Sequence, residues 1–167
     1  HPRDAPPPSP DTYLSDSLDA GEGPGRTHVA VSGTQWKPEI PNQWSPFRPY
    51  GFGMQLRKKA VGGHWVHLGI PLLTQLNGTA QKISQVEFCA KSSNGVVTTP
   101  TPIHFWDNDT RFRIQTIAWP ADNNYHCVAV PFNPPVWKQA LNISVYLHFN
   151  SVADSIFLYK GWVLLVD

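Results

Sequence analysis

Apolar and polar residues alternate along much of the chain from Thr27 onward. The alternation is clearest over residues 52–57 and 142–149, where every second side chain is large and apolar. A period of two places apolar side chains on one face of an extended strand and polar side chains on the other. The pattern therefore predicts β-strands. No window has a convincing helical period, and residues 136–141 are expected to form at most one short helical turn.

Further strands are expected where β-branched and aromatic runs lie between prolines and Gly/Asn turns. These runs are residues 28–36, 63–68, 82–91, 101–107, 110–118, 125–132 and 155–166. About eight or nine strands at this spacing predict an all-β fold, an antiparallel β-sandwich of the jelly-roll kind. A closed barrel is the alternative.

The first 26 residues differ in composition from the rest of the chain. They are rich in proline, glycine and acidic residues and contain almost no large apolar side chains. Such a segment buries too little surface to offset its ordering entropy. We therefore predict an extended N-terminal arm or linker over residues 1–26 and a single β-sandwich domain over residues 27–167. Tyr13, Leu14 and Leu18 could anchor the arm on the domain or on a partner, and a processed propeptide remnant is an equal alternative.

Strand parity places the two cysteines. Cys89 falls with Glu87 on the less apolar side of its strand, and Cys127 falls with Tyr125 on the less apolar side of another. We therefore predict a Cys89–Cys127 disulfide that joins neighbouring strands and does not pin the two sheets together. The alternative is a pair of buried free thiols, which would be typical of a cytosolic protein.

Three Asn-X-Ser/Thr triplets begin at Asn77, Asn108 and Asn142. Two are expected in turns and the third on the polar side of a strand, and exposed positions of this kind are where a glycan can be carried. Together with the cysteine pair, the triplets predict a secreted, extracellular glycoprotein.

Charge and motifs exclude several classes of function. The net charge is only +1 and no Lys/Arg stripe is present, so no nucleic-acid partner is expected. No apolar run approaches the roughly 20 residues of a membrane span, so no membrane insertion is expected. No cofactor is predicted, because no phosphate-cradling loop or dinucleotide motif is present. The carboxylates are too scattered to nominate an acid/base pair, so no catalytic residue is predicted.

Motifs for metal binding are weak, and no metal site is predicted. The segment Asp107-Asn108-Asp109 favours a hairpin turn over a calcium loop. His64 and His67 lie three residues apart on a strand and so point to opposite faces. If His1 is the mature N-terminus, it could hold copper in a polysaccharide-oxidising enzyme. The second ligand would then be one of the following histidines: His104, His126 or His148.

Aromatic residues give the leading functional hypothesis. Seven tryptophans are many for this length, and several lie in proline-bounded segments. Rigid aromatic loops at one end of a sandwich provide platforms for sugar rings or partner proteins. The predicted ligand-binding residues are Trp36, Trp44, Phe47, Tyr50, Trp119 and Trp137. The alternative is that these rings close the open ends of the sandwich.

Three segments carry a family resemblance: Tyr-Gly-Phe-Gly at residues 50–53, Gly-His-Trp-Val-His-Leu-Gly-Ile-Pro at 63–71 and Ile-His-Phe-Trp-Asp at 103–107. They resemble small secreted β-sandwich proteins of unknown function from fungi and soil bacteria. The likeness covers about residues 27–167. It implies the fold and export, and it implies no catalytic residue.

These observations favour a secreted, non-catalytic protein that binds carbohydrate or a cell-surface glycoprotein partner. One alternative is a structural or assembly component that self-associates through residues 1–26. The other is a copper-dependent or hydrolytic polysaccharide-active enzyme.

Overall fold

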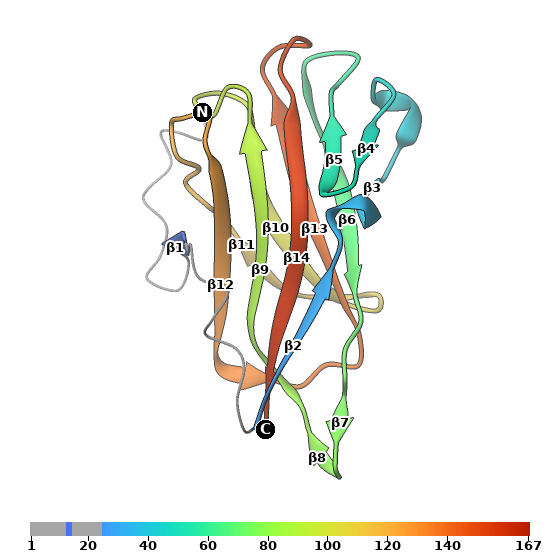
Figure 1. Ribbon diagram of the computed structural model, residues 1–167, viewed down its shortest axis with the longest axis vertical. Coiled ribbons are helices and arrows are strands. Elements are labelled where there is room, and N and C mark those ends of the chain that lie inside the picture. The colour runs from blue at the N-terminus through green and yellow to red at the C-terminus, as the bar shows by residue number, and fades with distance from the viewer. Residues whose placement is uncertain (1–12, 15–24) are drawn as a thin grey trace.

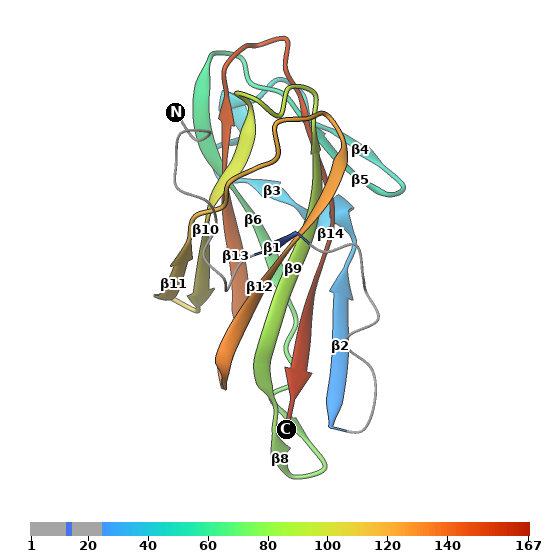
Figure 2. The ribbon, with the colours of Figure 1, turned by 90° about the vertical axis from the view of Figure 1, so that its left-hand side faces the viewer.

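Two antiparallel β-sheets face each other in the computed structural model, which describes residues 13–14 and 25–167 (Figure 1). In the view turned by 90°, β11, β10 and β13 lie to the left of β9, β14 and β2 (Figure 2). The seven-stranded sheet follows the order β1 (Tyr13–Leu14), β12 (Tyr125–Val136), β9 (Lys82–Ser92), β14 (Ile156–Val166), β5 (Gly53–Leu56) and β4 (Arg48–Tyr50), with β2 (Arg26–Val31) also paired to β14.

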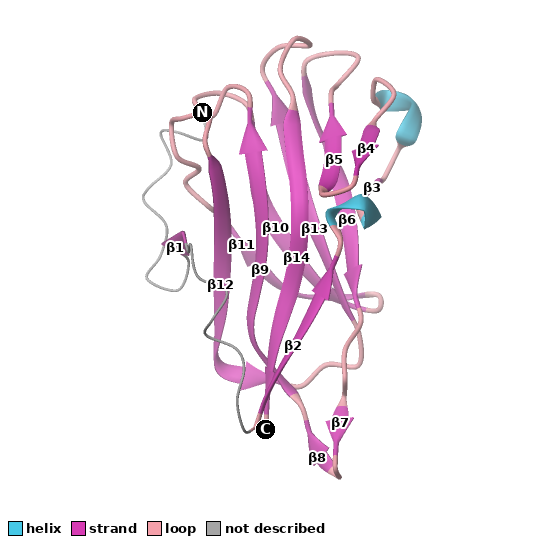
Figure 3. Ribbon diagram, viewed as in Figure 1, coloured by secondary structure: helices cyan, strands magenta, loops and turns pink. Residues whose placement is uncertain are grey.

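The five-stranded sheet carries the face that matters most for the candidate site. Its order is β11 (Thr110–Gln115), β10 (Thr99–Asp107), β13 (Leu141–Phe149), β6 (Gly62–Ile70) and β3 (Lys37–Pro38). A small separate hairpin joins β7 (Gln75–Leu76) to β8 (Thr79–Ala80). Helical structure in the described part of the chain is limited to two short 3-10 turns, η2 (Gly33–Gln35) and η3 (Pro41–Gln43) (Figure 3).

The predicted all-β antiparallel sandwich is confirmed. The predicted number of strands was too low, because short strands such as β3, β4, β7 and β8 are only two or three residues long. Runs of that length are too short to show a period. Residues 136–141 form no helical turn: β12 ends and β13 begins within this segment.

The core forms where the apolar phases of the two sheets meet. On β13, Ile143, Val145 and Leu147 are fully buried, and Val86 of β9 and Val163 of β14 are buried in the opposite sheet. The intervening residues of each strand therefore point away from the core, onto the two outer faces of the sandwich.

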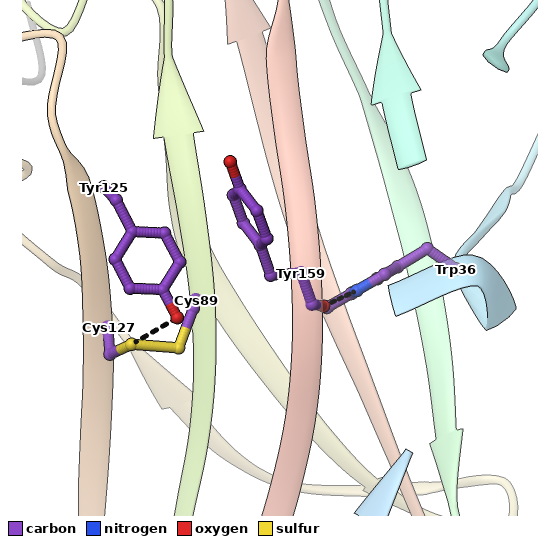
Figure 4. The surroundings of a disulfide bond; sticks show 5 residues. All are labelled: Trp36, Cys89, Tyr125, Cys127 and Tyr159. Atoms are coloured by element: carbon purple, nitrogen blue, oxygen red, sulfur yellow. Dashed lines mark hydrogen bonds between the residues drawn. A yellow bond between two sulfur atoms is a disulfide. The ribbon is translucent and has the colours of Figure 1, made fainter. Parts of the chain in front are cut away.

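The disulfide joins Cys89 and Cys127, as predicted. The two residues face each other directly across β9 and β12, with their Cα atoms 4.0 Å apart. The bridge therefore links neighbouring strands on the outer face of the seven-stranded sheet (Figure 4).

Part of the N-terminal arm pairs with the β-sandwich of its own chain. In β1, Tyr13 is paired with Ala129 and Leu14 with Val128, at the edge of the sheet formed by β12. Leu18, the third predicted anchor, lies outside the described residues.

Candidate functional site

Three of the predicted ligand-binding tryptophans lie in the core. Trp36, Trp44 and Trp119 are each no more than 2% exposed, so none presents a ring face to a ligand. For these three residues the prediction of a binding platform was wrong, because their indoles are buried members of the hydrophobic core. The ring of Trp36 packs edge-on against Phe88 at 5.9 Å, and that of Trp44 against Phe149 at 5.7 Å.

The other three predicted aromatic residues reach the surface at separate places. Phe47 is 37% exposed in the segment before β4, and Tyr50 lies on β4 itself. Trp137 is 46% exposed just after β12, and its indole Nε1 donates to the carbonyl oxygen of Thr74 at 3.1 Å. The six predicted residues therefore do not form one platform.

A different set of residues converges on the outer face of the five-stranded sheet. Ser144 on β13 is paired with His104 of β10 on one side and with His67 of β6 on the other. Trp65 lies two residues before His67, and Trp106 two residues after His104, so all five side chains share one face. The alternation that buries Val66 and Phe105 thus presents two indoles and two imidazoles to solvent.

This face is hollowed in two adjoining places. The first hollow has a volume of about 240 Å³ and is lined by Glu39, Trp65, His67, His104, Trp106, Arg111 and Ser144. The second has a volume of about 450 Å³ and is lined by Val31, Gln35, Lys37, His67, Gly69, Pro71 and Asn142. The two hollows lie side by side on either side of His67, and we call them together the sheet groove.

Small side chains between large ones create the sheet groove. Gly69 and Asn142 are paired across β6 and β13, next to the pair formed by His67 and Ser144. A side chain built at Gly69 would meet nothing within 4 Å, so the backbone there is open to the groove. The floor of the sheet groove is therefore low at Gly69 and Asn142. Trp65 and Trp106 bound the groove on one side.

Aromatic contacts hold the first hollow in shape. The ring of Trp65 reaches across β13 to lie 4.3 Å from that of His104 and packs edge-on against Tyr146 at 5.3 Å. The guanidinium of Arg111 lies 5.9 Å from the ring centre of Trp106. Burial, helped by the positive charge of Arg111, lowers the pKa of His104, so this imidazole is neutral at pH 7 and can both donate and accept.

Hydrogen bonds link the polar residues of the sheet groove in a chain. His67 Nδ1 lies 2.7 Å from Ser144 Oγ, and His67 Nε2 lies 3.1 Å from Glu39 Oε1. Asn142 Nδ2 donates to the same Ser144 oxygen at 3.2 Å. The chain fixes each side chain in one orientation, as a site requires when it must present donors and acceptors to a ligand.

His64 and His67 point to opposite faces of their strand, as predicted, and the acidic segment at residues 107–109 lies at the predicted hairpin turn. His67 faces the groove, whereas His64 is paired with Leu147, whose side chain points into the core, so the two imidazoles lie on opposite faces. Asp107 accepts backbone N–H groups of Gln139 and Ala140, at 3.4 and 3.1 Å, beside the hairpin of β10 and β11.

The three histidines considered for copper are spread over the molecule. His104 and His148 lie on the outer face of the five-stranded sheet but four residues apart in register, roughly 13 Å along a strand. His126 is on β12, where its Nε2 lies 2.6 Å from Asp122 Oδ1. His1 lies outside the described residues. In the described part of the chain only Glu87, Cys89 and Cys127 gather as potential ligands, and both sulfurs are already in the disulfide.

The predicted glycosylation positions differ in setting. Asn77 and Asn108 occupy exposed turns, with positive φ angles of 50° and 53°. Asn142 is half-buried and lines the sheet groove. Only the first two positions therefore extend freely into solvent.

Sequence reasoning missed the sheet groove although its signal was present. The alternation over residues 63–70 assigns Trp65 and His67 to the outward phase, and that over 101–107 does the same for His104 and Trp106. A tryptophan on the polar phase of a strand needs an explanation, because large apolar rings normally take the core phase.

Comparison with known proteins identifies the fold. No protein-family model matches the chain, and no curated protein sequence matches it either. Among solved structures, the xylan-binding module CBM15 is similar, with a TM-score of 0.52 at 11% identity, over 85% of this chain and 97% of that module. The CBM36-1 domain of a xylanase from the hindgut metagenome of Trinervitermes trinervoides gives a TM-score of 0.47 at 8% identity, over 82% and 96% of the two chains.

The likeness to CBM15 shows that this chain shares the β-sandwich fold of a carbohydrate-binding module. At 11% identity it shows the fold alone. In the described residues, no helix has the length and apolar character needed to cross a membrane.

Proposed function

We propose that this protein binds carbohydrate without altering it chemically, and that the glycan lies in the sheet groove. The observation that carries the proposal is the pairing of Trp65 and Trp106 with a fixed array of polar groups in one depression. Sugar rings present apolar C–H faces and polar hydroxyl edges, so a site for them needs aromatic surface beside oriented donors and acceptors. Similarity in fold to a xylan-binding module supports the same function.

The dimensions of the groove favour an oligosaccharide over a single sugar. Its lining residues come from β11, β10, β13, β6 and β3 and from segments beside β3, so it crosses the whole five-stranded sheet. Four strand spacings amount to roughly 19 Å. Its charges are of both signs, Glu39 against Lys37 and Arg111, which suits a neutral glycan chain.

Titration calorimetry with a panel of neutral oligosaccharides, including xylohexaose and cellohexaose, tests this proposal. We expect at least one to bind and Trp65→Ala to weaken that binding by more than tenfold. Trp137→Ala is the matched control, because Trp137 is exposed but lies outside the groove. Equal loss in both variants, or no binding to any member of the panel, would contradict the proposal.

A second candidate function is ester hydrolysis in the same groove. A nucleophilic serine needs a base within hydrogen-bond reach and a third group that orients the base, and Ser144, His67 and Glu39 have this connectivity. Acetate release from acetylated xylan, abolished by Ser144→Ala, would support this function. No release by the unaltered protein would leave the three residues with a positioning role only.

We also infer export to an oxidising compartment, which the disulfide supports. N-glycosylation at Asn77 and Asn108 is compatible with their exposed turns. A glycan at Asn142 would fill the sheet groove and compete with its ligand, so we expect this third position to be unmodified in the binding-competent protein.

A further inference from the structure

The outer face of the other sheet carries a second concentration of aromatic residues. Phe52 stacks on Tyr50 at 5.4 Å, on Phe157 at 6.0 Å and on Tyr159 at 5.7 Å, and Tyr125 packs edge-on against Tyr159 at 4.8 Å. Phe52 is 55% exposed and Tyr125 is 47% exposed. These five rings therefore form a continuous apolar strip in contact with solvent, on the opposite side of the sandwich from the sheet groove.

Strand register aligns this strip with two cations. Arg48 is paired with Gln55, Gln55 with Phe157, Phe157 with Lys91, and Lys91 with Tyr125, across β4, β5, β14, β9 and β12. Residues directly opposite one another on neighbouring strands point to the same face. The row therefore spans roughly 19 Å, with a positive charge on each side of Phe157. We call it the cationic row.

The strip also contains a hollow with a polar rim. The hollow has a volume of about 350 Å³ and is lined by Phe52, Lys91, Ser93, Ser155, Phe157 and Tyr159. A protein partner normally buries about 800 Å² of each surface, whereas a concave site of this volume suits a small ring. Its chemistry is that of a ring-binding site: aromatic surface, hydroxyl groups and one ammonium.

Nearby carboxylates do not neutralise the two cations. Neither Lys91 nor Arg48 forms an ion pair with another described residue, and both are exposed. Glu87, four residues before Lys91 on the same face, is buried, and the carboxylate of Asp154 accepts a hydrogen bond from the hydroxyl of Thr98. Arg48 Nη1 donates only a long hydrogen bond to the phenol of Tyr50, at 3.5 Å. A ligand that supplies negative charge is therefore favoured.

The fold holds this face rigidly. The disulfide fixes β9 to β12 beneath it, and the Tyr125 hydroxyl donates to Sγ of Cys127 at 3.2 Å (Figure 4). The carbonyl oxygen of Tyr159 accepts the buried indole N–H of Trp36 at 2.8 Å. At Gly53 any Cβ would lie 2.4 Å from the carbonyl oxygen of Leu158, so glycine is required for β5 to lie this close to β14.

We propose that the cationic row and its hollow form a second glycan site, selective for acidic polysaccharide. The pyranose rings of uronic acid units stack on Phe52, Phe157 and Tyr159, while their carboxylates bind Lys91 and Arg48. The site is separate from the sheet groove and does not depend on the function proposed for it. A neutral chain would gain the stacking but not the charge-assisted hydrogen bonds.

Calorimetric titration with tetragalacturonic acid tests this second site. We expect Lys91→Gln to lower the affinity about tenfold, because a charge-assisted hydrogen bond is lost. Lys82→Gln is the matched control, since Lys82 is exposed at the other end of the same strand and should change the affinity less than about twofold. Phe52→Ala should also weaken binding severalfold, which attraction between charges alone would not require.

Variants of the two sites separate the two proposals. Trp65→Ala should leave tetragalacturonic acid binding intact, and Lys91→Gln should leave neutral oligosaccharide binding intact. Added salt should weaken only the acidic ligand. The second site would be overturned if tetragalacturonic acid fails to bind, if Lys82→Gln weakens binding as much as Lys91→Gln, or if Trp65→Ala abolishes binding of the acidic ligand.

Discussion

The two outer faces of this sandwich rest on one core but differ in what they present. On the five-stranded sheet, small residues such as Ser144 and Gly69 leave a groove whose polar groups are tied together by hydrogen bonds. On the seven-stranded sheet, aromatic rings cover part of the surface, and cationic side chains such as that of Lys91 lie beside them. The same alternation builds both faces, so the identity of the outward residues decides what each face can bind.

The faces also differ in how they are held. The seven-stranded sheet has a covalent clamp between β9 and β12, whereas the five-stranded sheet is held by ladder hydrogen bonds and by packing onto the core. Changes that act on one face should therefore leave the other nearly unaffected, because sites without shared partners behave independently.

The largest expected effect comes from removing the clamp. Replacing both Cys89 and Cys127 by serine should lower the free energy of unfolding by about 4 kcal/mol, from the loop entropy of a 38-residue separation. Denaturant unfolding measures this change. Neutral oligosaccharide affinity measured below the unfolding transition should be unchanged, and a matching loss of affinity would show that the two faces are coupled.

Filling the sheet groove should remove binding while sparing stability. Gly69 is exposed and a Cβ added there would have free space around it, so Gly69→Phe should fold, and the strand should gain propensity. We expect neutral oligosaccharide affinity to fall more than tenfold, a loss of more than about 1.4 kcal/mol. Gly51→Phe is the matched control, because Gly51 also has nothing within 4 Å but lies in the turn before β5. Unchanged affinity in Gly69→Phe would place the ligand elsewhere.

A buried carboxyl on the seven-stranded sheet should give that sheet its own pH dependence. Glu87 is fully buried and its carboxylate has no hydrogen-bond partner among the described residues. Burial raises its pKa from 4.5 to about 7, and the positive charge of Lys160 opposes the rise.

Because the folded state holds this proton more tightly than the unfolded state, the stability that Glu87 contributes is present below pH 4.5 and is lost as pH rises to about 7. The loss should be about 3 kcal/mol, and Glu87→Gln should abolish it. Unfolding measured from pH 4 to pH 8 checks this prediction. An equal slope in the variant would assign the pH dependence to other groups.

The smallest effect should come from the end of the hydrogen-bonded chain. Glu39→Gln keeps a hydrogen-bond acceptor near His67 but removes the charge, so neutral oligosaccharide affinity should fall about fivefold, or about 1 kcal/mol. Asp109→Asn, in the exposed turn after β10, is the control and should have no effect. Calorimetry measures the affinity of both variants. Identical affinities would show that the hydrogen bonds among Glu39, His67 and Ser144 do not orient the side chains of the sheet groove.

Sequence patterns were sufficient for the framework because they act locally. A period of two assigned Val86 and Val145 to the core and the cysteines to outer positions, and the observed Cys89–Cys127 pairing follows from that phase. Local patterns could not reveal the register, which places Ser144 between His67 and His104 although these residues are far apart in the sequence.

The aromatic residues show why the site itself was missed. Trp36 and Trp44 lie in proline-bounded segments that suggested exposed loops, yet these segments fold back so that both indoles enter the core. Trp65 lies in a regular strand, which suggested only a structural role, yet the alternation of that strand directs the indole to solvent. Whether an indole is buried depends on which element covers it, and tertiary packing alone determines that.

Binding of neutral glycan to the outer face of the five-stranded sheet can be observed residue by residue. Nuclear magnetic resonance of isotopically labelled protein, titrated with the tightest-binding neutral hexasaccharide, reports where the ligand lies. We expect the largest chemical-shift changes on β6, β10 and β13, including the indole N–H groups of Trp65 and Trp106. Changes confined to the seven-stranded sheet, or to the surroundings of Phe47 and Trp137, would show that the sheet groove is not the binding surface.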